Sequence, residues 1–290
     1  MTGFRYVLIF GIILILAGCS SPKALLWEIS HDSLENPSYL YGTVHVLGES
    51  DFIMHENAET ALSASEQLVL ELNPTSPDVQ SELIKAMAMT DGQTLQSILG
   101  DDFDAVAAVF ADSFNLDLNQ LNRIKPFFVA SMIIPKLLNE AAKSYELVFI
   151  EKAVGLGIGI AELETVADQV GALDQMSHEE QAEMLRTTAF EIQEQREMFK
   201  YLVELYHQED IKKLNKASVE LSDMQDFEAA LLTKRNQNWI PLIETFIKEK
   251  SSFIAVGAAH LAGDEGVIKL LKEAGYKLTP LPSSGVNMLK

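Results

Sequence analysis

The chain has 290 residues, of which 48% are hydrophobic and 22% charged, and its formal net charge at pH 7 is −20. This composition excludes a disordered or collagen-like protein, and a single cysteine excludes a core held by internal disulfides. Because 42 acidic side chains stand against 22 basic ones, the protein repels a phosphate backbone, and we expect no nucleic-acid partner.

The first eighteen residues predict a signal peptide rather than part of the fold. A short stretch with one cation, Arg5, precedes the apolar run VLIFGIILIL over residues 7–16. Ten helical residues span about 15 Å, which is half of the hydrocarbon core of a bilayer. The run is therefore too short to cross a membrane and has the length of a signal-peptide core.

The only cysteine, Cys19, follows this run after the tripeptide LAG. The order resembles a bacterial lipobox, in which small residues give a peptidase access to the bond before a cysteine that becomes lipidated. The alternative is an ordinary signal peptide with a chance cysteine. We expect a bacterial envelope lipoprotein, residues 19–290, held in the membrane by a lipid on Cys19. In a Gram-negative cell, Ser20 after the cysteine predicts the outer membrane, facing the periplasm.

Predicted strands gather at the two ends of the mature chain, and predicted helices fill its middle. The first predicted elements are a hairpin of residues 25–29 and 39–41 around Asn36-Pro37 and a buried strand over residues 68–72. A mostly helical stretch from residue 77 to about 146, an inner strand over residues 157–163 and helices from about residue 165 to 250, with the capping box Ser177-x-x-Glu180, follow. The chain then continues with a strand over residues 253–256, a helix over residues 265–274 and a strand over residues 276–281. We therefore expect one α/β (α+β) domain over residues 19–290. Its central mixed β-sheet is formed by the N- and C-terminal strands, with a long helical insertion over approximately residues 76–250.

Two distant segments, residues 42–49 and 257–264, share the pattern Gly-x-x-His-x-x-Gly-acid. Each follows an apolar, strand-like run, so the glycine permits a sharp turn and the histidine can face the crevice at the carboxyl end of the strand. His45 and His260 presented in this way can bind one metal ion or serve as acid and base. The alternative is a pair of turn histidines that hydrogen-bond nearby carbonyl groups. The match between the two segments favours a shared site.

Two glutamates and an arginine could complete such a site. Glu71 lies within the apolar run LVLEL, where an ionised carboxylate is costly unless it is paired or bound. Glu164 ends the strand-like run 157–163 and opens a helix, so it is either a site residue or an acid favoured by the helix dipole. Arg235 occupies the apolar stripe of its predicted helix and should reach solvent or a carboxylate. For Arg235, structural pairing and binding of a substrate carboxylate are both open.

At these residues the chain resembles the TraB/PrgY/GumN family, which is related to the TIKI metalloproteases and more loosely to erythromycin-esterase-like and ChaN-like proteins. The matching segments run in family order: residues 41–45 (YGTVH), 69–72 (VLEL), 163–165 (LET) with Gln169, 235–236 (RN), and 256–261 (VGAAHL) with Gly263, Gly266 and Gly275-Tyr276. The resemblance implies an α/β core with a helical insertion and a metal-dependent hydrolase site. The metal ligands it implies are His45, Glu71 and His260. The catalytic residues it implies are Glu71, Glu164 and Arg235.

Two functions are compatible with these residues. The first is a metal-dependent hydrolase, such as a peptidase, acting on a peptide or small-molecule substrate. Two histidines and one carboxylate suit Mn, Fe, Co or Zn, and they leave positions open for water and substrate. The second function is a non-enzymatic lipoprotein that binds a small ligand, haem or a peptide in the same crevice. Only a hydrolase needs a carboxylate beside the histidines, so Glu71 favours the hydrolase.

Overall fold

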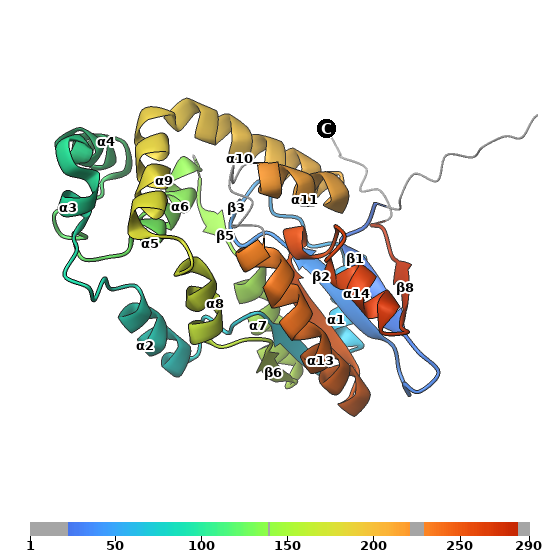
Figure 1. Cartoon of the computed structure of the whole chain (residues 1–290). Helices are drawn as coiled ribbons and strands as arrows, with labels where there is room; N and C mark the ends of the chain where they lie inside the picture. The colour runs from blue at the N-terminus through green and yellow to red at the C-terminus, as the bar shows by residue number, and fades with distance from the viewer. Residues whose placement is uncertain (1–22, 139, 221–228, 284–290) are drawn as a thin grey trace, which may run out of the picture.

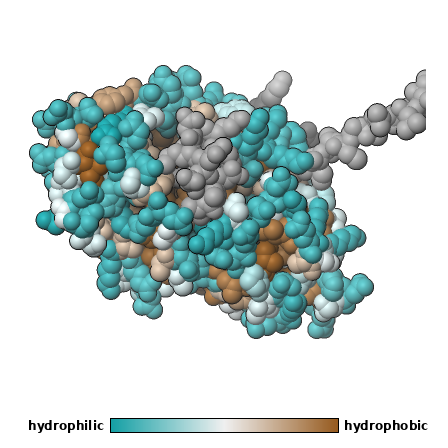
Figure 2. Space-filling model, viewed as in Figure 1, coloured by the Kyte–Doolittle hydropathy of each residue, from teal (hydrophilic) through white to brown (hydrophobic). Residues whose placement is uncertain are grey.

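The computed structural model describes residues 23–138, 140–220 and 229–283 (Figure 1). The expected signal peptide, residues 1–18, and Cys19 lie outside these ranges, so the lipid anchor stays a prediction. Within the described ranges, no helix is long and apolar enough to cross a membrane. The face in Figure 2 is mostly hydrophilic, with apolar residues in small patches.

A six-stranded mixed sheet forms the centre of the fold, in the order β6-β4-β7-β2-β1-β8. The predicted hairpin is confirmed as the antiparallel pair β1 and β2, and β8 pairs antiparallel with β1. Strands β2, β7, β4 and β6 run parallel to one another. The bounds are β1 (Leu26–Ser30), β2 (Ser38–Thr43), β4 (Gln67–Leu70), β6 (Gly159–Glu162), β7 (Ser252–Gly257) and β8 (Lys277–Pro280), with β3 (Leu47–Gly48) and β5 (Ala142–Lys143) in a separate ribbon.

The expected α/β class, a mixed sheet built from the two ends of the chain with helices inserted between them, is therefore confirmed. One expected detail is wrong: the strand within residues 157–163 lies at the edge of the sheet. β6 pairs only with β4 in the described chain, and both of its end residues, Gly159 and Glu162, are exposed. The apolar run resembled a buried strand because periodicity does not report how many neighbours a strand has.

Helices occupy most of the chain between β4 and β7. Their bounds, with α1 and α14 outside that interval, are α1 (Glu56–Ser63), α2 (Pro77–Ala86), α3 (Leu95–Leu99), α4 (Phe103–Phe114), α5 (Pro126–Ser131), α6 (Ile134–Leu137), α7 (Tyr145–Leu156), α8 (Val166–Leu173), α9 (His178–Phe190), α10 (Ile192–His207), α11 (Ile211–Glu220), α13 (Lys234–Glu249) and α14 (Val267–Glu273). Helices α3, α4, α5 and α9 pack in a core of their own, whereas α7, α10, α11 and α13 contribute to the core around the sheet. The single-domain boundaries, 19–290, stay a prediction.

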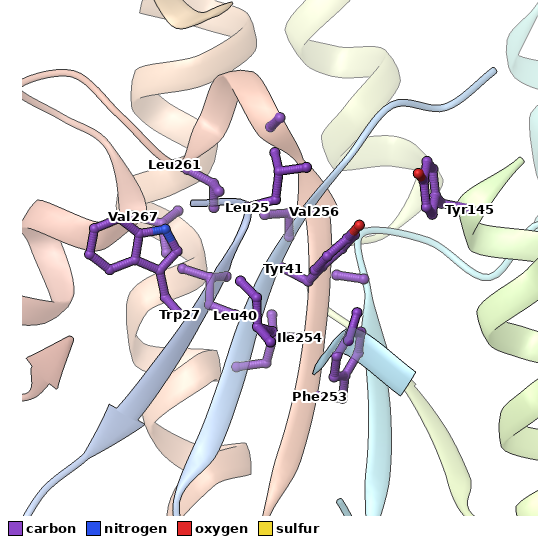
Figure 3. Close-up of a cluster of buried hydrophobic side chains, with 14 of the residues drawn as sticks. Leu25, Trp27, Leu40, Tyr41, Tyr145, Phe253, Ile254, Val256, Leu261 and Val267 are labelled. Carbon is purple, nitrogen blue, oxygen red and sulfur yellow. The ribbon is translucent and has the colours of Figure 1, made fainter. Parts of the chain in front are cut away.

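Both faces of the central strands are buried, as expected for parallel strands. Figure 3 shows Tyr41 and Phe253 on the side of Tyr145, and Trp27 and Leu40 on the other side. The Phe253 ring lies 4.9 Å from that of Phe149 on α7, centroid to centroid. Burial of each large apolar side chain contributes about 1.5–3 kcal/mol, so this packing fixes the strands firmly.

Parallel pairing brings three strand ends to one edge of the sheet. Thr43 at the end of β2 is in register with Gly257 at the end of β7, and Leu70 at the end of β4 is in register with Ala255. The residues that follow these strands therefore meet at that edge. These residues include His45, Glu71 and His260.

Candidate active site

The first histidine turn places His45 against a carboxylate on α7. His45 Nδ1 lies 3.0 Å from Glu146 Oε1, which also accepts a hydrogen bond from Thr43 Oγ1 at 2.8 Å. Ser144 Oγ donates to the other carboxylate oxygen at 2.7 Å. Because an ionised carboxylate only accepts, Nδ1 of His45 carries a proton, and Nε2 is left for the crevice.

Glu146 sets the charge of His45. Burial lowers the pKa of His45, but the hydrogen bond and negative charge of Glu146 outweigh burial and raise the pKa to about 9. Burial also raises the pKa of Glu146, but its bonds to His45 and Ser144 bring it below the ordinary value. The His45 side chain is 66% exposed and that of Glu146 is 14% exposed, so water screens the pair. His45 is therefore an imidazolium at neutral pH.

The second histidine turn buries its side chain. β7 ends at Gly257, and a short 3-10 helix, Ala258–His260, carries the imidazole to a position where it is 6% exposed. Its Nδ1 lies 2.6 Å from Asn236 Oδ1, while the amide nitrogen of Asn236 donates to the carbonyl of Glu265 at 2.8 Å. The oxygen of Asn236 is thus the acceptor, Nδ1 of His260 carries the proton, and Nε2 carries the lone pair.

His260 is neutral where His45 is charged. Its Nε2 faces Arg235 Nη1 at 3.3 Å and Glu71 Oε1 at 3.9 Å. Burial lowers the pKa of His260 to about 3, because the favourable charge of Glu71 does not compensate for desolvation and for the nearby Arg235 and His45 cations.

Arg235 joins the two predicted glutamates at the base of the crevice. Its Nη2 lies 2.5 Å from Glu71 Oε2, and the guanidinium binds Glu164 through Nε at 3.0 Å and Nη2 at 2.7 Å. Nη1 donates to the carbonyl of Leu231 and to His260 Nε2. These contacts occupy all five N–H donors of a guanidinium. The structure therefore favours structural pairing of Arg235 over binding of a substrate carboxylate.

The two glutamates differ in their affinity for a proton. Burial raises the pKa of Glu71, but the charges of His260, Arg235 and His45 and the Gly257 N–H at 2.7 Å lower it to about 2. Burial raises the pKa of Glu164 above its ordinary value, despite its bonds to Arg235. Such a divergence between neighbouring carboxylates is typical of acid–base sites.

The side chains converge at Gly257. A Cβ atom at this position would lie 3.4 Å from Glu71 Oε1, 3.5 Å from His260 Cδ2 and 3.8 Å from His45 Nε2. The backbone angles of Gly257, φ −53° and ψ 134°, are open to any residue, so the glycine is not required for the turn itself. Its missing side chain leaves space among the three polar groups.

A divalent cation fits this crevice in donor chemistry but not in spacing. In the described part of the chain, no group of three His, Cys, Asp or Glu side chains is arranged to hold a metal ion. Both imidazoles have Nδ1 bound to an oxygen acceptor, which leaves Nε2 to face a metal, as is usual for metal-binding histidines. Nε2 of His45 would first have to lose the proton that it carries in the imidazolium. The guanidinium of Arg235, however, faces the lone pair of His260. A shared ion therefore requires Arg235 or His260 to shift.

The structure thus brings His45, Glu71 and His260 together, with Glu164 and Arg235 beside them; their metal-binding and catalytic roles stay predictions. Sequence reasoning missed Glu146 and Asn236, which select the protonated nitrogen of each histidine. Glu146 was placed only at the approximate end of the predicted helical stretch 77–146, whereas in the structure it lies in the first turn of α7. Asn236 was matched only as the neighbour of Arg235, without a role.

A cavity of about 570 Å³ opens beside the buried ion pairs, between α8 and α13. Glu164, Arg235 and Trp239 line it together with small and apolar residues such as Ala167 and Leu242. Trp239 Nε1 donates to Glu164 Oε2 at 3.2 Å and holds that carboxylate at the cavity wall. The volume is typical of sites for small molecules.

Residues 25–280 match the TraB/PrgY/gumN family, and the chain belongs to this family. It is 23% identical to Metalloprotease TIKI1 of Danio rerio, over 91% of this chain and 64% of that protein. It is 24% identical to Metalloprotease TIKI1 of Xenopus tropicalis, over 91% and 63%, and 21% identical to a Metalloprotease TIKI homolog of Amphimedon queenslandica, over 90% and 62%. The chain spans less than two thirds of the length of these relatives. No solved structure matches it.

Proposed function

We propose that the protein is a lipid-anchored, metal-dependent hydrolase of the bacterial envelope that cleaves peptide bonds. One observation carries this proposal: His45 Nε2, Glu71 Oε1 and the ring of His260 converge on the space left by Gly257. The relatives that are named metalloproteases support a hydrolase and a metal cofactor. The lipobox around Cys19 supports the anchor.

His45, Glu71 and His260 would hold the cation, which is Mn, Co, Fe or Zn because imidazole and carboxylate ligands suit all four. A bound cation would polarise the scissile carbonyl and lower the pKa of a water molecule. Glu146 and Asn236 orient the two imidazoles.

Glu164 lines the neighbouring cavity, and its raised pKa suits a group that takes up a proton and returns it to the leaving amine. Arg235 is a positioning residue, because its ion pairs hold both carboxylates at the crevice.

A second candidate is a non-enzymatic lipoprotein that binds a small ligand, haem or a peptide. The observation that favours it is the guanidinium of Arg235, which occupies the lone pair of His260 that a metal would need. Elemental analysis of the purified protein, followed by a peptide-library cleavage screen with each of the four metals, separates the two functions. Metal-free protein that cleaves nothing, yet binds a ligand in the crevice, would establish the second.

Gly257→Ala tests whether the hydrolase works at this crevice. The added methyl group would stand 3.4 Å from Glu71 Oε1 and 3.8 Å from His45 Nε2, in the space for the ion. We expect little change in the melting temperature and a loss of metal and of cleavage by at least about tenfold, equivalent to about 1.4 kcal/mol. Gly159→Ala, with no atom within 4 Å of its new methyl group, is the matched control. Wild-type metal content and cleavage in Gly257→Ala would contradict the assignment.

The anchor has its own test. Cys19→Ser should release the protein from the membrane fraction or leave the precursor unprocessed, because serine lacks the thiol that receives the lipid. The measurement is membrane fractionation with gel mobility of parent and variant. A variant that fractionates and migrates like the parent would exclude the anchor.

A further inference from the structure

The described chain begins at the same edge of the sheet as the crevice. β1 and β2 are antiparallel, with Leu26 in register with Tyr41, so the start of β1 lies beside the end of β2. The carbonyl of Leu25 accepts a hydrogen bond from the backbone N–H of Gly42 at 2.9 Å. Gly42 is the first residue of the turn that carries His45.

Helix α11 connects the chain start to the second histidine turn at that edge. Lys23 Nζ forms an ion pair with Asp210 Oδ2 at 3.0 Å, and Asp210 directly precedes α11. Further along the helix, Asn215 Nδ2 donates to the carbonyl of Ala259, next to His260, at 2.9 Å. Both histidine turns are therefore tied to the segment where β1 begins, the first directly and the second through α11.

The expected lipid attachment lies only four residues before Lys23. A fully extended chain covers about 3.3–3.6 Å per residue, so the Cα atoms of Cys19 and Lys23 can be at most about 14 Å apart. A compact domain of this size has a diameter of about 50 Å. A tether that is short relative to the domain limits which face can approach the membrane, and that face is the one around Lys23.

We infer that the crevice lies on the membrane-facing side and that the substrate is a membrane-bound polypeptide cleaved close to the lipid surface. This inference rests on the proposed lipid anchor and hydrolase function. The turn between β1 and β2, around Asn36, lies at the opposite end of these strands and faces away from the lipid.

Local charge agrees with this orientation. The protein as a whole is strongly acidic, but the first turn of α11 exposes Lys212 and Lys213, which directly follow Asp210 and Ile211 in the chain. Asp210 pairs with Lys23 and lies 3.9 Å from Lys213 Nζ, so two lysines share one aspartate where α11 begins. Lysines near an anionic membrane surface are attracted to its lipid phosphates, which helps to keep the start of α11 against the membrane.

Fluorescence quenching measures the orientation without reference to activity. The lipidated protein is purified from membranes and reconstituted into phosphatidylethanolamine–phosphatidylglycerol vesicles that carry a headgroup quencher. A thiol-reactive dye is placed on Glu49→Cys, four residues after His45, or on Glu35→Cys in the β1–β2 turn; both positions are exposed. Because Cys19 is the only native cysteine and carries the lipid, only the introduced thiol reacts. We expect several-fold stronger quenching at position 49. Equal quenching, or stronger quenching at position 35, would overturn the inference.

Cleavage tests the substrate class. A peptide cut in the library screen is attached to vesicle lipid through a short or a long polyethylene glycol spacer. The lipidated protein should cleave the short-spacer substrate at least about tenfold faster, a difference of about 1.4 kcal/mol. A Gly/Ser insertion of about twelve residues after Ser21 should remove this preference, because it lengthens the maximum reach of the tether by about 40 Å.

The failures of the two proposals are distinguishable. The same lipidated protein in detergent micelles with free peptide is the activity control. Absence of cleavage there contradicts the proposed hydrolase and leaves the quenching result to decide the orientation. Cleavage of free peptide together with equal rates on both spacers shows that the hydrolase is right and that the membrane-proximal substrate is wrong.

Discussion

The two histidine turns share one sequence pattern but hold their histidines in opposite states. His45 is 66% exposed and its pKa is raised to about 9, whereas His260 is 6% exposed and its pKa is lowered to about 3. Both follow parallel strands that end at one edge of the sheet. The pattern therefore sets where each imidazole lies, and it does not set its charge.

The difference comes from the helix that packs on each turn. Helix α7 supplies a carboxylate, Glu146, to His45, while α13 supplies a neutral amide, Asn236, and a cation, Arg235, to His260. At neutral pH the crevice thus contains one charged and one neutral imidazole around the ionised Glu71. Groups whose pKa values are driven apart by their surroundings are suited to different steps of acid–base chemistry.

The largest expected effect follows from removing the cation on the His260 side. Arg235→Met leaves Glu71 and Glu164 buried without their shared partner, and breaking a buried ion pair in this way costs about 3–5 kcal/mol. Chemical denaturation of the metal-free protein gives the loss in the free energy of unfolding.

Lys234→Met is the matched control for this change. Lys234 is the exposed neighbour of Arg235 on the same helix, so its replacement should change stability by no more than about 0.5 kcal/mol. A loss in Arg235→Met as small as in this control would mean that the buried carboxylates do not depend on the guanidinium.

Sequence reasoning located the main parts of the fold because they depend on local pattern. The hairpin of β1 and β2 was readable from two apolar runs around Asn36-Pro37, and the segment from β7 to β8 from its strand–helix–strand pattern. The position of β6 at the edge was not readable, because the number of neighbours of a strand depends on the rest of the chain.

The residues of the candidate site also divide into those that the sequence located and those that it did not. His45 and His260 could be located from the repeated turn, and Glu71 and Arg235 because each is a charge in an apolar pattern. Glu146 could not be located in this way, because its role depends on the first turn of α7 packing against His45, which is about a hundred residues earlier in the sequence. A glutamate in the first turn of a helix has the same local sequence pattern whether or not a histidine from elsewhere in the chain contacts it.

The pH dependence of stability sharpens the comparison, because the two histidines contribute with opposite signs. His260 has a folded pKa of about 3, so below pH 6.5 the unfolded state binds a proton that the folded state does not. Stability should fall as the pH drops from 6.5 towards 3, by up to about 1.4 kcal/mol per pH unit. Glu71, with a folded pKa of about 2, adds a loss below pH 4.5.

Above pH 6.5 the histidine that affects stability is His45, and its protonated form is the one that the folded state favours. His45 has a folded pKa of about 9, so the stability it contributes is present below pH 6.5 and is lost as the pH rises to 9; solvent screening keeps this loss small. Urea unfolding with a chelator from pH 4.5 to 9 measures both limbs. His260→Gln should flatten the limb between pH 4.5 and 6.5. An unchanged acid limb in His260→Gln would show that His260 is not the group held neutral.

The smallest effect on stability, and the most direct test of the comparison, is expected at Glu146. Glu146→Gln keeps an acceptor for Thr43 and His45 but removes the negative charge, so the pKa of His45 should fall from about 9 to near or below its ordinary 6.5. Because His45 is largely exposed, stability at neutral pH should change by less than about 1 kcal/mol. An NMR titration of the imidazole resonances, assigned with His45→Gln, follows the pKa. Glu151→Gln, an exposed change on the same helix, should leave it unchanged. If the pKa of His45 stays near 9 in Glu146→Gln, then α7 does not set its charge, and the two turns differ for another reason.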